Sequence, residues 1–131
     1  MKFSYSIIAA LALGLPAMAQ SSDLITSMSE ADFAEFAESQ GHDVLGFGEA
    51  GEVSIRAMTG DGTTYYLTGT ACNELGDCKG VNMSARFQYE DWYTLESINT
   101  ANIQRAAVSV WKLDNMLGIS RYVILDDGVT Q

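Results

Sequence analysis

The stretch YYLTGTACNELGDCKGVNMSARFQY, residues 65–89, has the pattern of two strands joined by a short loop between two cysteines. Residues 65–71 are rich in aromatic and β-branched side chains, which favour strands. Residues 81–89 alternate between apolar and polar, as in a strand with one packed face and one face that is solvated or partly covered. The predicted packed face consists of Val81, Met83, Ala85, Phe87 and Tyr89. We therefore predict an antiparallel pair of strands at the centre of the fold.

The N-terminus, residues 1–19, has the pattern of a secretory signal peptide. Lys2 gives a positive start, residues 7–15 are apolar, and the Ala-Met-Ala sequence at 17–19 is typical of a cleavage site. A membrane anchor is the alternative, but the apolar run is too short to span about 30 Å of hydrocarbon. We expect a periplasmic or secreted protein that begins at Gln20 and is not inserted in a membrane after cleavage.

Cys72 and Cys78 are the two cysteines of the chain. An even cysteine count in an exported protein predicts a structural disulfide. A redox-active pair is the alternative, but the spacing is not C-x-x-C, and Lys79 is the only basic neighbour that could lower a thiol pKa. With His42 as the single histidine, the sequence offers no convincing set of zinc ligands, so we expect neither a metal site nor a cofactor.

Length and charge limit the possible function classes. The 131 residues suit one domain, which we place at residues 29–131 after an N-terminal tail at 20–28. The 17 acidic residues outnumber the seven basic ones, for a formal net charge of −10. Such a polyanion repels nucleic acid and anionic membrane surfaces, so we expect neither as a partner.

The first helix has clear start and stop signals. Ser29 is a good N-cap, and Asp32 three residues later makes a weak form of the capping box. Gly41 follows at the position where a left-handed residue ends a helix. Strands are predicted at 42–47, 53–58 and 63–71, separated by short turns, which indicates an antiparallel meander. The predicted class is therefore α+β, with helices packed on an antiparallel sheet.

A second helix is predicted from residue 95 to about 105, with Thr94 as its cap. Residues 106–113 fit a helix or a strand, and residues 119–125 are predicted as a strand after a turn at 114–118. We favour a hairpin over 106–125. Asn99 and Asn102 lie on one face of this helix, although asparagine is a poor helix former. We expect their amides to bond an adjacent strand edge or loop, with a ligand contact as the alternative.

Several segments, taken together and in their order along the chain, resemble the YbjN-like family, described as putative bacterial sensory transduction regulators. The resemblance rests on ITSMSEADF (25–33), GHDV (41–44), the two-cysteine loop leading into MSARF, INTAN (98–102) and SRYVILDDGVT (120–130). It implies a fold similar to type III secretion chaperones, and it agrees with the hairpin at 106–125. It also implies a closing C-terminal helix, yet this sequence ends where that helix would begin. Either the chain is truncated or another element covers the sheet.

The family supplies no catalytic residues, and no nucleophile and base accompany His42 in a recognisable pattern. We therefore expect a non-enzymatic protein-binding or chaperone-like regulatory module, which acts on a protein partner or as a homodimer. The alternative is a domain that senses a small ligand in a pocket between the second helix and the sheet.

Overall fold

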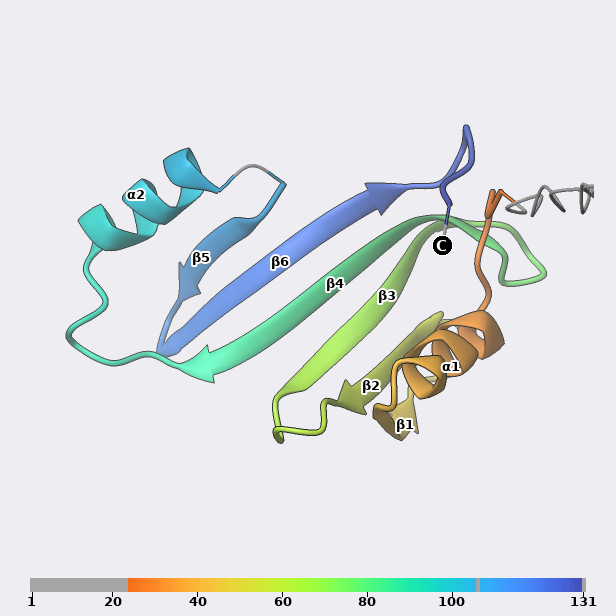
Figure 1. Cartoon of the computed structure of the whole chain (residues 1–131), viewed down its shortest axis with the longest axis horizontal. Helices are drawn as coiled ribbons and strands as arrows, with labels where there is room; N and C mark the ends of the chain where they lie inside the picture. The colour runs from red at the N-terminus through yellow and green to blue at the C-terminus, as the bar shows by residue number, and fades with distance from the viewer. Residues whose placement is uncertain (1–23, 106, 131) are drawn as a thin grey trace, which may run out of the picture.

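The computed structural model describes residues 24–105 and 107–130, so the predicted signal peptide at 1–19 lies outside it. Over these residues the chain forms an open, six-stranded antiparallel sheet with two helices (Figure 1). The predicted α+β class is confirmed. In the part of the chain that is described, no helix has the length and apolar character to cross a bilayer.

The sheet is a meander with one change of order. Its spatial order is β1-β2-β3-β4-β6-β5, so the last strand of the chain lies inside the sheet and β5 forms an outer edge (Figure 1). The strands are β1 (Asp43–Phe47), β2 (Ser54–Met58), β3 (Thr64–Cys72), β4 (Cys78–Gln88), β5 (Ser109–Leu113) and β6 (Met116–Ile124).

The helix α1 (Glu30–Ser39) starts and ends as predicted. Its cap is reciprocal, because the Ser29 hydroxyl accepts from the Asp32 amide while the Asp32 carboxylate accepts from the Ser29 amide at 2.7 Å. The Ser29 hydroxyl also donates to the Asp32 carboxylate at 2.7 Å. The bond from the Ser29 amide, and next the bond from its hydroxyl, lower the pKa of Asp32. Beyond the helix, Gly41 has a φ of +74°, a conformation that glycine adopts without strain. The chain therefore turns sharply into β1.

The core lies between α1 and one face of the sheet. Phe33 and Ala37 of α1 are fully buried in a cluster that also includes side chains from β2, β3 and β4. The buried cluster consists of Phe33, Ala37, Ile55, Ala57, Tyr65, Leu67, Val81 and Leu125. Glu30 adds a polar link, because its carboxylate accepts from the Ser54 amide at the start of β2. The sheet face that carries this cluster is called the α1 face below.

The described part of the expected N-terminal tail is paired with the rest of the domain. Ile25 pairs with Val129, and Met28 pairs with Cys78 through two backbone hydrogen bonds of 2.9 and 3.0 Å. Ile25 and Met28 also pack against the core cluster. Residues 25–28 thus bridge the start of β4 and the turn after β6. These contacts join positions about 50 and 100 residues apart, so no local pattern revealed them.

The predicted hairpin over 106–125 is confirmed as β5 and β6, but its turn is shorter than expected. Asp114 and Asn115 alone connect the strands, and residues 116–118 belong to β6 rather than to a turn. Asp114 has a φ of +50°, which aspartate tolerates better than most residues. Similarly, β4 begins at Cys78, three residues earlier than predicted, because pairing with β3 continues to the two cysteines. The helix α2 (Leu95–Gln104) precedes this hairpin and is capped by Thr94 as predicted.

Candidate functional site: the two faces of the sheet

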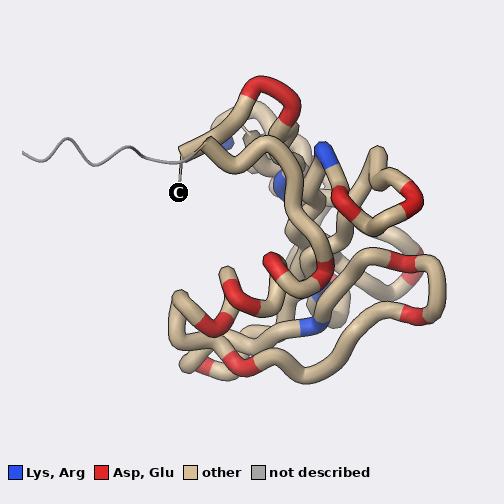
Figure 2. The backbone as a smooth tube through the Cα atoms, turned by 90° about the vertical axis from the view of Figure 1, so that its right-hand side faces the viewer, with Lys and Arg blue, Asp and Glu red and all other residues tan. Residues whose placement is uncertain are grey.

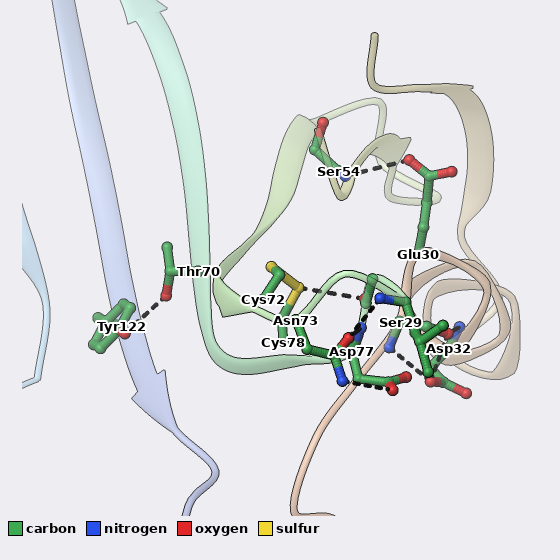
Figure 3. The surroundings of a disulfide bond; sticks show 12 residues. Ser29, Glu30, Asp32, Ser54, Thr70, Cys72, Asn73, Asp77, Cys78 and Tyr122 are labelled. Atoms are coloured by element: carbon green, nitrogen blue, oxygen red, sulfur yellow. Dashed lines mark hydrogen bonds between the residues drawn. A yellow bond between two sulfur atoms is a disulfide. The ribbon is translucent and has the colours of Figure 1, made fainter. Parts of the chain in front are cut away.

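Cys72 and Cys78 form the predicted disulfide (Figure 3). They face each other at the end of the β3–β4 pair. Between them the Asn73 side chain organises the loop, because its oxygen accepts from the amides of Leu75 and Asp77 at 3.0 and 2.9 Å. Cys78 is fully buried, and Gly69 on β3 leaves no room for a side chain beside its sulfur. A disulfide fits an oxidising compartment outside the cytosol.

His42 lies between α1 and β1, and its side chain forms a hydrogen bond with Tyr65 of β3. Its Nδ1 lies 2.8 Å from the hydroxyl oxygen of Tyr65, and the two rings meet edge to face. Tyr65 is 5% exposed, and burial raises the pKa of its hydroxyl group. The pair therefore satisfies a polar group at the border of the core. This geometry gives the single histidine a structural role.

The two asparagines of α2 have different surroundings in the structure. The Asn102 amide donates to the carbonyl of Val110 at 2.9 Å and accepts from the Val110 amide at 2.7 Å. Its side chain thus pairs with the outer edge of β5 as a neighbouring strand would. Within the described residues, no hydrogen bond involves the Asn99 side chain, which is exposed. Because α2 buries none of its residues, the Asn102 pair is a main attachment of this helix to the sheet.

The Asn102→Ala variant is expected to lose about 1–2 kcal/mol of stability, because two hydrogen bonds of modest net value disappear. The Val110 amide should exchange its hydrogen faster, since the variant lacks the Asn102 oxygen to which this amide donates. Hydrogen exchange followed by NMR measures both effects. Asn99→Ala is the matched control, one turn earlier on the same helix. Equal acceleration at Val110 in both variants would contradict the role of Asn102.

The α1 face is covered at one end and open at the other. The strand register aligns Ala57, Tyr65, Ala85, Ile119 and Val110 in one row across β2, β3, β4, β6 and β5. Ala57 is fully buried and Tyr65 is 5% exposed, whereas Ile119 is 37% exposed. The next row repeats the trend, from Leu67 at 4% to Met83 at 46%. Apolar side chains therefore continue past the point where α1 stops covering them.

We call this uncovered part the open apolar face. It consists of Met83, Phe87 and Ile119, which are exposed. Ala85 and Val110 beside them are half-buried, and Leu117, which pairs with Phe87 on the same face, is buried. The prediction that the apolar face of β4 is packed is correct for Val81 and wrong for Met83 and Phe87. Figure 1 shows the reason: α1 lies over β1 and β2, while α2 lies by β5 at the far end of the sheet. On the opposite face, which was predicted to be solvated or partly covered, Ser84 is buried.

The charged positions on this face are basic. Arg121 pairs with Met83, and Lys112 pairs with Leu117, so the register places both beside the open apolar face. The Lys112 ammonium also lies 4.4 Å from the centre of the Tyr89 ring. In contrast, α1 carries exposed carboxylates at Glu35 and Glu38. Figure 2 shows acidic residues spread over the turns and helices, with few basic residues among them.

Two hollows bear on the predicted ligand pocket between α2 and the sheet. A hollow of 490 Å³ beside α2 is lined by residues of that helix and its cap, and neither Asn99 nor Asn102 is among them. A larger hollow of 1130 Å³ lies on the sheet face opposite α1, over β2 and β3. Among the residues described, no three acidic, histidine or cysteine side chains are placed to share a metal ion.

The sequence resemblance has no independent support from comparison with other proteins. No protein-family model, no curated protein and no solved structure matches the chain. Membership of the YbjN-like family and similarity to type III secretion chaperones thus stay predictions from the quoted segments.

Proposed function

We propose that this protein is a non-enzymatic, protein-binding module of the periplasm or the secreted space, and that the open apolar face is its binding surface. The observation that carries the proposal is the rise in exposure along single rows of the sheet, from Leu67 to Met83 and from Tyr65 to Ile119. Contiguous exposed apolar side chains mark interaction sites in soluble proteins. A chaperone-like or regulatory role is consistent with such a surface.

The partner we propose is a second copy of the chain. In each copy α1 covers one half of its face and presents Glu35 and Glu38 outward, while the other half is apolar and carries Arg121 and Lys112. A copy related by a two-fold axis would bring its α1 over the open apolar face, with carboxylates near the two basic groups. Opposite charges favour this orientation over the alternatives. A two-fold interface also uses the same surface in both copies.

Sensing of a small ligand beside α2 is the less supported alternative. The hollow there is lined by α2 and its capping residues without any residue of the sheet, and the Asn102 side chain is already bonded to Val110. A thermal-shift screen of metabolites and ions tests it, because a ligand that prefers the folded state raises the melting temperature. Protein binding has the better support from the exposed apolar side chains.

Replacing Ile119 by aspartate is expected to abolish self-association of the mature chain. The substitution puts a charge into the centre of the open apolar face, where burial against a partner would strip it of water. Sedimentation equilibrium should show a dimer for the unmodified chain and a monomer for Ile119→Asp. Because Ile119 is partly exposed, the fold of the variant should persist, and circular dichroism checks this.

The matched control is Ile124→Asp, which places the same charge on the same strand but on the opposite face. Ile124 is 65% exposed and pairs with Gly80 rather than with the open apolar face. This variant should remain a dimer. A monomeric unmodified chain would exclude the second copy as partner, and an absence of crosslinked proteins in the periplasmic fraction would then exclude protein binding altogether.

A further inference from the structure

The large hollow on the sheet face opposite α1 has a strand floor and two loop walls. Its floor is formed by β2 and β3 with Arg86 of β4, and its volume is 1130 Å³. One wall is the β1–β2 connection, residues 48–53, and the other is the loop between Cys72 and Cys78. Both walls are held by local bonds, from the Gly48 amide to the Ser54 carbonyl and from the Asn73 amide to the Asp77 carbonyl. The disulfide holds the second wall at its base. The hollow is thus preformed.

Two arginines line this hollow. Arg56 on β2 pairs in register with Tyr66 on β3, and the Arg86 guanidinium carbon lies 5.2 Å from the centre of the Tyr66 ring. Over the described residues the one ion pair is Lys79 with Asp126, so neither arginine lies within 4.0 Å of a carboxylate oxygen. In a chain with 17 acidic residues, two arginines beside a tyrosine therefore keep their full capacity to bind an anionic group.

The walls of the hollow carry the opposite charge. Glu49 and Glu52 line it from the β1–β2 connection, and Glu74 lines it from the disulfide loop. A purely anionic molecule would be attracted by the floor and repelled by both walls. A purely cationic molecule would be repelled by the floor and attracted by both walls. A molecule with both charges matches floor and walls together. The rim also offers apolar contact, because Phe47 is 62% and Leu75 86% exposed.

We propose that this hollow binds a short peptide that carries both a carboxylate and an amino group. The carboxylate lies against the Arg56 and Arg86 guanidiniums, whose planar forks pair with carboxylates through two parallel hydrogen bonds. The amino group lies toward the glutamates of the walls. The volume exceeds what a single amino acid occupies and suits a few residues in extended form. This site is on the other side of the sheet from the open apolar face, so the two proposals stand independently.

The test is an NMR titration of the mature, isotope-labelled chain with the tetrapeptide Lys-Gly-Gly-Glu. We expect its addition to shift the amide signals of Ser54, Tyr66 and Thr68, which line the floor. Succinate supplies the carboxylates alone and putrescine the amines alone, and each should bind at least about 10-fold more weakly. Added salt should weaken tetrapeptide binding, because exposed charges are screened.

Substitutions of the two arginines test whether they bind the carboxylate of the tetrapeptide. Arg56→Gln and Arg86→Gln should each weaken tetrapeptide binding about 10-fold or more, the loss expected for a charge-assisted hydrogen bond. Arg121→Gln is the control, because it removes the same group from the α1 face of the same sheet. The proposal is overturned if the floor amides do not shift, if succinate binds as tightly as the tetrapeptide, or if Arg121→Gln weakens binding as much as the floor variants do.

Discussion

The Phe33→Ala variant is expected to unfold with about 3–5 kcal/mol less free energy than the unmodified chain. Phe33 is fully buried in the cluster between α1 and the sheet, so its removal leaves a cavity that the surrounding side chains fill only in part. Domains of this size have about 5–15 kcal/mol of stability in total, so the loss is a large part of it. Denaturant unfolding, followed by circular dichroism, measures the change.

Phe47→Ala is the control for this prediction. It removes the same ring from a β1 position that is 62% exposed, and it should change the free energy of unfolding by less than about 1 kcal/mol. If the Phe33 and Phe47 variants lose the same stability, Phe33 is not the anchor of the core. A variant of Phe33 too unstable to purify would itself agree with the prediction when the Phe47 variant is obtained normally.

Removal of the disulfide is the second large effect. The Cys72→Ala, Cys78→Ala double variant is expected to lose about 2 kcal/mol, because a short closed loop no longer restricts the unfolded chain. The melting temperature should fall by on the order of 10 °C. The region around the two cysteines should also lose stability locally, since Cys78 pairs with Met28 and Asn73 holds the loop between the cysteines. Thermal unfolding with and without reductant measures it.

Two further observations check the disulfide. Reductant should lower the melting temperature of the unmodified chain and leave that of the double alanine variant unchanged. Intact mass after alkylation should show two thiols only when reductant is added first. Two free thiols in protein taken directly from the oxidising compartment would contradict the disulfide, and so would a melting temperature that does not respond to reductant.

Short-range patterns predicted much of this fold because their physical causes act over a few residues. Ser29 and Asp32 cap α1 through bonds between positions three apart, and Thr94 caps α2 by accepting from the Ser97 amide. Cys72 and Cys78 close a short loop. The hairpin at the end of the chain follows from β-branched residues on both sides of an Asp-Asn turn.

The candidate sites depended on contacts that no local pattern contains. Alternation in β4 placed Met83 and Val81 on the same face, but it could not tell how far α1 extends over that face. The two arginines of the hollow are 30 residues apart, and they line the same space only because β2, β3 and β4 are neighbours. One sequence signal could have placed these arginines on a common face. Arg56 and Arg86 each lie between apolar residues in an alternating strand, and this alternation puts both side chains on the face away from the core.

By itself, then, the sequence determined the α+β class, the caps, the disulfide and the acidic character of this protein. Only the tertiary structure decided that β6 pairs with β4 and leaves β5 at the edge, that Ile25 and Met28 are paired, and that Met83, Phe87 and Ile119 are uncovered. The reason is the range of the interactions. Caps, turns and alternation act over a few residues, whereas strand order and the area that one helix covers depend on packing between distant parts of the chain.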